Sequence, residues 1–317
     1  MCRSARGRRT GDRHSKQCDG DVSVSERSAL GMSDHLTVKD QRHPRRLHFC
    51  IDGQGPVTVL FEAGLGKSRS TWALAQPLVA RFARTVVYDR AGLGRSDAAV
   101  APRTFGALLR DHLSVLDTVV SGPCILVGHS YGGPIARLAA AERPDKVVGI
   151  VLVDEVSERA GADLLRRAMA GAGALYGGQV WLARVGLLGQ ALRRTYFRAV
   201  EGAALREVVI ESGRVPAAKA ARSEWQNMIA GMHDLEATGP HVPDIPLTEI
   251  TSKRSSTPEE FENDFIYQSH KATAEAAIDG RHVSSRSRNH YIQLAEPRLV
   301  ASEIERMSDR TRVRYSA

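Results

Sequence analysis

The segment Cys124–Gly133 constrains the fold of this chain more than any other stretch. An apolar run of strand type leads directly into Gly-His-Ser-Tyr-Gly, with the serine at position 130, and a helix-forming stretch follows at 134–142. Glycines flank Ser130 because a Cβ there would clash within so sharp a turn. The pattern predicts a strand–turn–helix unit that lifts the Ser130 hydroxyl above a sheet and points the Tyr131 N–H at a developing oxyanion.

Strand and helix patterns alternate along most of the remaining chain. We expect strands at 46–51, 57–62, 85–88, 147–153 and 246–251, and helices at 70–83, 104–119, 134–142, 259–275 and 297–307. This alternation predicts an α/β fold with a doubly wound, mostly parallel sheet. Between the strands expected at 147–153 and 246–251, only helical patterns occur, at 162–169, 179–197, 204–212 and 217–232. An insertion of this kind predicts an all-helical cap over the sheet.

Four regions follow from these patterns. Residues 1–44 are rich in Arg, Ser and Asp, lack apolar periodicity and are predicted to be a disordered tail, with Met32 as an alternative start. Residues 45–156 form the first part of the α/β core, 157–243 the helical cap and 244–317 the second part of the core. The acidic residues in the tail argue against a transit peptide.

Composition excludes several classes of protein. The sequence contains no run of 18 apolar residues, so we expect no membrane span. It also begins without an apolar segment, so we expect no secretory signal. The four cysteines are scattered and no H-E-x-x-H pair occurs, so we expect no metal site and a cytoplasmic location. A net charge of +8 with only 5% aromatic residues indicates a basic surface rather than a nucleic-acid site. The oligomeric state stays open.

Together with the serine turn, a second motif gives the chain a resemblance to the α/β-hydrolase superfamily over about residues 45–310. Glu62-Ala63-Gly64-Leu65-Gly66 follows a strand, as the superfamily's oxyanion loop does. The resemblance implies that the Leu65 N–H joins that of Tyr131 in the oxyanion hole. Glu62 stands where histidine is common, and a carboxylate aimed into the hole would oppose the reaction. We therefore expect Glu62 to turn away and pair with Arg90 or Arg95.

Two further motifs extend the resemblance. The segment 88–97 is similar to a glycine-rich turn whose Asp89 and Arg90 tie down backbone. The segment 287–293, followed by Pro297, resembles the loop of the catalytic histidine and identifies His290 as the expected base. A serine hydroxyl is a weak nucleophile, and an imidazole must take its proton.

The acid that orients the histidine is ambiguous in the sequence. Most members of the superfamily carry it after the strand that follows the cap, but the loop at 252–257 has no carboxylate. Asp154 lies 24 residues after Ser130 at the end of a strand, where a second arrangement in the superfamily has its acid. We therefore expect Asp154 to be the acid, with Glu259 or Glu260 as the alternative.

The resemblance implies a cofactor-free serine hydrolase that cleaves a small carboxylic ester or lactone through an acyl-enzyme intermediate. The same residues would also support hydrolysis of C–C or amide bonds and perhydrolysis. A serine at position 130 argues against haloalkane dehalogenase and epoxide hydrolase chemistry, which need a carboxylate nucleophile. A ligand-binding protein without catalysis, built on the same fold, is the alternative from another class.

Overall fold

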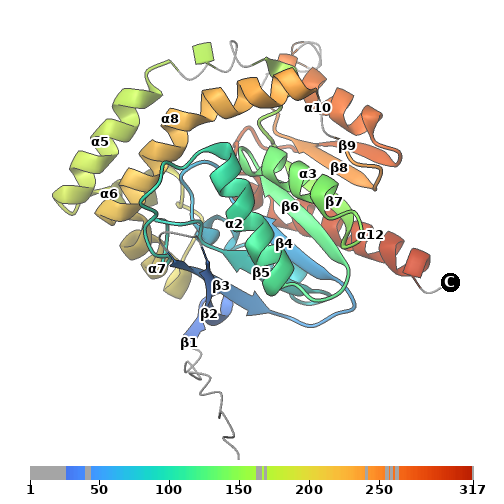
Figure 1. Ribbon diagram of the computed structural model, residues 1–317, viewed down its shortest axis with the longest axis horizontal. Coiled ribbons are helices and arrows are strands. Elements are labelled where there is room, and N and C mark those ends of the chain that lie inside the picture. The colour runs from blue at the N-terminus through green and yellow to red at the C-terminus, as the bar shows by residue number, and fades with distance from the viewer. Residues whose placement is uncertain are drawn as a thin grey trace, which may run out of the picture.

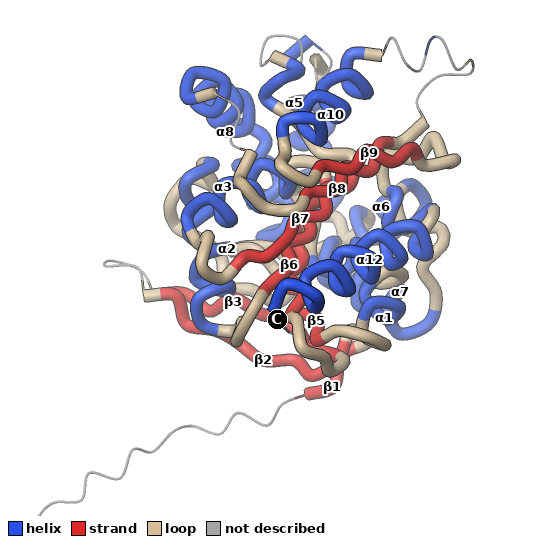
Figure 2. Tube along the Cα trace, turned by 90° about the vertical axis from the view of Figure 1, so that its right-hand side faces the viewer, coloured by secondary structure: helices blue, strands red, loops and turns tan. Residues whose placement is uncertain are grey.

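The computed structural model describes residues 26–39, 44–161, 166–167, 170–239, 242–253, 257, 260 and 264–315. Its centre is a nine-stranded sheet in the order β1-β2-β3-β5-β4-β6-β7-β8-β9. Figure 2 shows this sheet nearly edge-on, with helices on both sides. The strands are β1 Glu26–Ser28, β2 Gly31–Val38, β3 Arg45–Asp52, β4 Thr58–Glu62, β5 Arg84–Tyr88, β6 Cys124–His129, β7 Val147–Val153, β8 Leu247–Thr251 and β9 Gly280–Ser284.

The predicted mostly parallel, doubly wound sheet is confirmed. From β5 to β9 every neighbouring pair is parallel, whereas β1, β2, β3 and β5 pair antiparallel. Glu62 on β4 lies opposite Gly128 on β6, and Gly128 lies opposite Leu152 on β7. Leu152 in turn lies opposite Glu249 on β8. This register brings the segments that follow β4, β6, β7 and β8 to one edge of the sheet, where open α/β sheets bind ligands.

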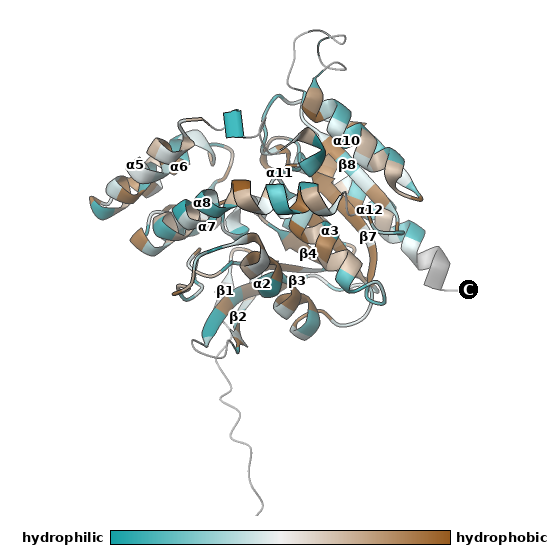
Figure 3. Cartoon of the chain, turned by 45° about the horizontal axis from the view of Figure 1, so that its top comes forward, coloured by the Kyte–Doolittle hydropathy of each residue, from teal (hydrophilic) through white to brown (hydrophobic). Residues whose placement is uncertain are grey.

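Helices cover both faces of the sheet (Figures 1 and 2). Helices α2 and α3 pack on one face with residues of α10, and α1 and α12 pack on the other. On each face, apolar residues of the central strands fill the space between the sheet and its helices. These strands are brown in Figure 3. The bounds are η1 Arg69–Trp72, α1 Gln76–Val79, α2 Phe105–Thr118, α3 Gly132–Glu142, α10 Phe265–Ala276, α11 Ile292–Ala295 and α12 Pro297–Tyr315.

The prediction of a disordered tail over residues 1–44 is wrong for the part that the structure describes. Strands β1 and β2 form an antiparallel edge of the sheet, and Leu30 between them is buried in the core. The Ser33 hydroxyl lies 2.6 Å from Nε2 of buried His48 on β3. Strand β2 escaped prediction although Met32, Leu36 and Val38 alternate with polar residues, because the polar composition of the whole segment 1–44 outweighed this short pattern. Residues 1–25 and 40–43 lie outside the described residues.

The described elements between β7 and β8 are all helices. Helix α8 runs across the top of the molecule and packs against α5 and α2 (Figure 1). The predicted helix at 179–197 divides around Gly186, whose φ of +75° ends α5. The predicted helix at 162–169 lies mostly outside the described residues. The bounds are η2 Glu158–Ala160, α5 Ala172–Arg184, α6 Leu188–Thr195, α7 Gly202–Ser212 and α8 Val215–Thr238.

Buried ion pairs join these helices to the core. Arg69, which follows the β4 loop, contacts Glu207 at 2.9 Å and Glu211 at 2.7 Å on α7. Arg90 contacts Glu224 on α8 at 2.8 Å. Charged groups without water are stable only when paired in this way. No helix in the described part of the chain is both long and apolar enough to span a bilayer.

Candidate active site

Ser130 sits in the sharp turn between β6 and α3. Its φ of +53° is in the left-handed region, which non-glycine residues rarely adopt. A Cβ at Gly128 would lie 2.6 Å from the Gly132 carbonyl oxygen, so the turn closes only with glycine there. The Ser130 N–H donates to the Val153 carbonyl at 3.1 Å, which ties the turn to the end of β7. The strained turn therefore fixes the serine at the edge of the sheet.

His290 connects Ser130 to Asp154 through two hydrogen bonds. Its Nδ1 lies 2.6 Å from Asp154 Oδ2, and its Nε2 lies 3.0 Å from Ser130 Oγ. An ionised carboxylate can only accept, so Nδ1 carries the proton and Nε2 is free to accept the hydroxyl proton of Ser130. The three side chains come from positions 130, 154 and 290, which are far apart in the sequence, and the structure brings them within hydrogen-bond distance of one another. This arrangement can withdraw a proton from the serine.

Asp154 is fully buried, and Ser252 as well as His290 holds its carboxylate. Its φ of +48° makes it, with Ser130, one of two non-glycine residues of positive φ in the described chain. Ser252, just after β8, donates its N–H to Oδ1 and its hydroxyl to Oδ2, both at 2.9 Å. Glu260, the alternative acid, is exposed and its N–H bonds to Thr257, while Glu259 lies outside the described residues. The position of Asp154 beside His290 supports it as the acid.

The loop after β4 lies against the serine turn. Leu65 and Tyr131 line the same cavity as Ser130 and His290. Neither backbone N–H has an acceptor among the described residues, so both remain available for an oxyanion. A Cβ at Gly64 would lie only 2.8 Å from His129 Nδ1, which keeps this loop free of a side chain at its closest approach.

Glu62 turns away from this hole, as the sequence predicted. Its carboxylate pairs with Arg90, accepts from the Tyr88 hydroxyl and lies 2.7 Å from His112 Nδ1. Burial by itself would raise the pKa of Glu62, but the Arg90 guanidinium and the His112 hydrogen bond hold that pKa below its ordinary value. Arg95 pairs instead with Glu211. The negative charge of Glu62 is therefore neutralised behind the loop.

A cavity of about 400 Å³ opens over these groups. Tyr176 of α5 and Met228 of α8 line it from the helical insertion, and Phe265 and Ile266 line it from α10. Its walls are mostly apolar, which suits a small organic substrate. In the described parts of the chain no group of three or more His, Cys, Asp or Glu residues is placed to hold a metal ion.

Several residues of the site were not expected from the sequence. His129 is buried, and its Nε2–H donates to the His290 carbonyl at 3.0 Å, which anchors the histidine loop. Burial and the nearby His290 lower the pKa of His129 to about 3, so its ring stays neutral. Ser252 is signalled only by its place after β8, next to the end of β7. Lys67 lines the cavity two residues after Leu65.

This chain is similar to known proteins over parts of its sequence and over most of its fold. The family model described as "Alpha/beta hydrolase family" matches residues 59–303. An uncharacterized protein of Bacillus subtilis is 38% identical over 106 residues, which are 32% of this chain and 41% of that protein. A mitochondrial palmitoyl-protein thioesterase of Mus musculus is 45% identical over 64 residues, 20% of this chain and 22% of that protein. The matches thus span less than half the length of these relatives.

A solved structure extends the similarity over most of the fold. A variant of an epoxide hydrolase of Vigna radiata superimposes with a TM-score of 0.68 at 17% identity, covering 88% of this chain and 99% of that chain. At this identity the similarity establishes the arrangement of the sheet and helices and says nothing about the reaction.

Proposed function

The chain belongs to the alpha/beta hydrolase family, and on that premise we propose that it is a serine hydrolase that cleaves carboxylic esters or lactones without a cofactor. One observation carries the proposal: hydrogen bonds connect Asp154 to His290 and His290 to Ser130 on the floor of a cavity that fits a small molecule. A protein that only binds a ligand has no need for a strained serine hydrogen-bonded to a histidine.

The reaction would proceed in two stages. His290 Nε2 takes the proton of Ser130 as Oγ attacks the carbonyl carbon, and the N–H groups of Leu65 and Tyr131 bind the oxyanion. Asp154 stabilises the imidazolium, which then protonates the leaving alcohol. Water, activated by His290, attacks the acyl-serine and releases the acid. In each stage His290 first takes a proton from the nucleophile and then gives it to the leaving group. The nucleophile is Ser130 in the first stage and water in the second.

Thioesters are a second substrate class that the comparisons favour. The relative named a palmitoyl-protein thioesterase matches this chain over 64 residues, and thioester cleavage passes through the same acyl-serine. Epoxide hydrolysis is disfavoured in spite of the structural similarity, because it needs a carboxylate where this chain has Ser130. Hydrolysis of C–C or amide bonds and perhydrolysis remain alternative reactions of the same three residues.

A substrate panel tests the proposal. The panel contains p-nitrophenyl esters of graded chain length, several lactones and acyl thioesters, assayed with the wild type and with Ser130→Ala. The exposed Ser302→Ala on α12 is the matched control. We expect hydrolysis of at least one class, a loss of about 10³-fold or more in Ser130→Ala, and no change in the control. Turnover retained in a folded Ser130→Ala protein would refute the serine mechanism.

A further inference from the structure

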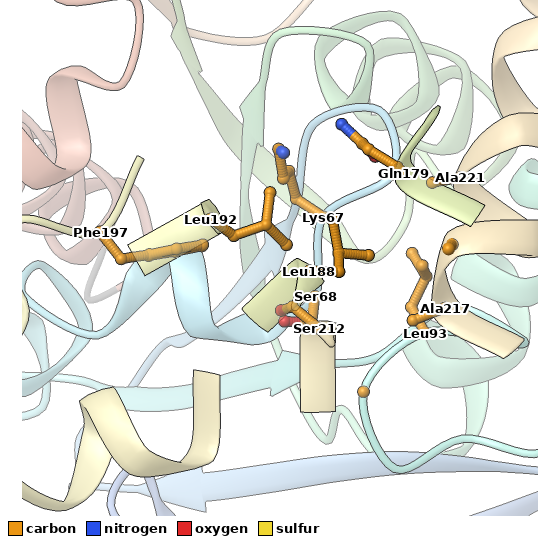
Figure 4. Close-up of a pocket in the computed structure, with 13 residues that line it drawn as sticks. Lys67, Ser68, Leu93, Gln179, Leu188, Leu192, Phe197, Ser212, Ala217 and Ala221 are labelled. Carbon is orange, nitrogen blue, oxygen red and sulfur yellow. The ribbon is translucent and has the colours of Figure 1, made fainter. Parts of the chain in front are cut away.

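Lys67 is a cationic residue in the lining of the cavity beside the proposed catalytic serine. Its N–H donates to the Gly64 carbonyl at 3.1 Å, so the residue is anchored in the turn of the oxyanion loop. The residue is half-buried and lines the cavity that holds Ser130 and His290. It also lines a smaller adjoining cavity of about 20 Å³, where it points to the same side as Gln179 (Figure 4).

The ammonium group of Lys67 contacts aromatic rings rather than a carboxylate. Its Nζ lies 3.9 Å from the centre of the Tyr196 ring and 5.9 Å from that of Tyr291. No carboxylate in the described part of the chain lies within ion-pair distance of Nζ. Burial lowers the pKa of Lys67 to about 8, and no negative neighbour offsets the effect. The group is therefore mostly protonated at neutral pH, yet it lacks the counter-charge that a lysine removed from water ordinarily has.

The acidic residues that line the same cavity are already engaged. Glu155 Oε2 accepts from Arg137 Nε at 3.0 Å. Asp264 Oδ1 caps α10 by accepting from the N–H groups of Ile266 and Tyr267 at 3.0 and 3.1 Å. Of the charged side chains described around this cavity, Lys67 is thus the one whose charged group makes neither a hydrogen bond nor an ion pair.

We propose that Lys67 binds an anionic group of the substrate, so that the enzyme acts on esters whose acyl or alcohol part carries a carboxylate. The ammonium has three N–H donors, and the ring faces of Tyr196 and Tyr291 attract its charge without supplying lone-pair acceptors. A substrate carboxylate would supply both the acceptors and the missing charge, in charge-assisted hydrogen bonds. This inference rests on the proposed serine hydrolase function and specifies the substrate class for that site.

Paired substrates that differ by one charge test the inference. For the acyl side we would compare mono-4-nitrophenyl adipate with 4-nitrophenyl hexanoate, which have acyl chains of equal carbon number. For the alcohol side we would compare 4-carboxyphenyl hexanoate with phenyl hexanoate. The ratio of kcat/KM for the anionic ester to that for the neutral ester is measured in the wild type, Lys67→Met and Lys67→Arg. Lys271→Met is the matched control, because Lys271 is exposed on α10 beside Glu275.

We expect Lys67→Met to lower this ratio by roughly 10- to 100-fold in at least one pair, the range for loss of a hydrogen bond to a charged group. Because the ratio compares two esters on the same variant, a change that affects both esters equally cancels. Lys67→Arg should restore most of the preference, and Lys271→Met should leave the ratio unchanged. Equal ratios in the wild type and Lys67→Met for both pairs would overturn the inference while leaving ester hydrolysis intact.

A binding measurement separates failure of the inference from failure of the proposed function. Calorimetric titration of Ser130→Ala with adipate, and with 1,6-hexanediol as the neutral counterpart, does not depend on turnover. We expect adipate to bind at least tenfold more weakly to Ser130→Ala/Lys67→Met than to Ser130→Ala. If the wild type hydrolyses no ester and this difference is found, the proposed function fails and the anion site stands. If adipate binds both proteins equally, the anion site fails.

Discussion

Replacing Arg90 by methionine should destabilise the protein far more than removal of an exposed ion pair. Arg90 donates five hydrogen bonds: two to Glu224 on α8, one to Glu62, and one each to the carbonyls of Ala63 and Gly64. Its side chain is 1% exposed, and so is that of Glu62, whereas that of Glu224 is 0% exposed. Methionine fills much of the same space but leaves two buried carboxylates without their cation.

The expected magnitude follows from this burial. Removing one partner of a buried ion pair costs about 3–5 kcal/mol, because the other charge stays in a medium of low polarity. The matched control is Arg143→Met, whose pair with Asp117 at 2.8 Å is roughly one-third to two-fifths exposed. Exposed pairs of this kind contribute about 0–1 kcal/mol. Urea unfolding at neutral pH measures the two free energies of unfolding side by side.

The same substitution should also lower activity, because Arg90 holds the carbonyls of the loop that carries Leu65. Loss of one oxyanion donor costs about 10²–10³-fold in kcat, which sets the upper limit for a displaced loop. A free energy of unfolding for Arg90→Met within 1 kcal/mol of that for Arg143→Met would refute the reasoning about the buried cluster.

Two further predictions concern the edge of the sheet and the stability of the fold at low pH. Deleting residues 1–31 should lower the free energy of unfolding by at least about 2 kcal/mol relative to deleting residues 1–25, because it removes β1 and buried Leu30; equal stabilities in urea would contradict the role of that edge. Although burial by itself would raise the pKa of Asp89, Arg69 and His48 lower it from 3.8 to about 2, so its ionised form stabilises the fold above pH 3.8 and this contribution fades as the pH falls toward 2. The loss in free energy of unfolding caused by Asp89→Asn should therefore be about 1 kcal/mol smaller at pH 3 than at pH 6. An equal loss at both pH values would show that the charge of Asp89 does not stabilise the fold.

The central strands could be predicted from sequence because they are buried on both faces. Val147–Val153 is a continuous apolar run, and its predicted and observed bounds agree. The single helix predicted at 70–83 is instead η1 followed by α1, because Pro77 cannot donate a backbone hydrogen bond inside a longer helix. Strand β9 was missed because it lies at the exposed edge of the sheet with polar residues such as Arg281.

The site could be predicted where local sequence determines local shape. The turn around Ser130 depends on its own glycines, and Asp154 lies at the end of the adjacent parallel strand. Ser252 and Lys67 could not be found in this way, because their contacts depend on how β8 and the β4 loop lie beside segments distant in the sequence. Tertiary packing, rather than any motif, brings these two side chains into the site.

The most direct test of the central claim is labelling of the serine by a fluorophosphonate probe, with the modified residue identified by mass spectrometry. We expect stoichiometric labelling of Ser130 in the wild type. The rate of labelling should fall strongly in Asp154→Asn, by up to about 10⁴-fold, and stay at the wild-type value in Glu260→Gln and Glu259→Gln. Labelling at another residue, or wild-type labelling of Asp154→Asn together with loss in either glutamate variant, would contradict the account of Ser130, His290 and Asp154 acting as one unit.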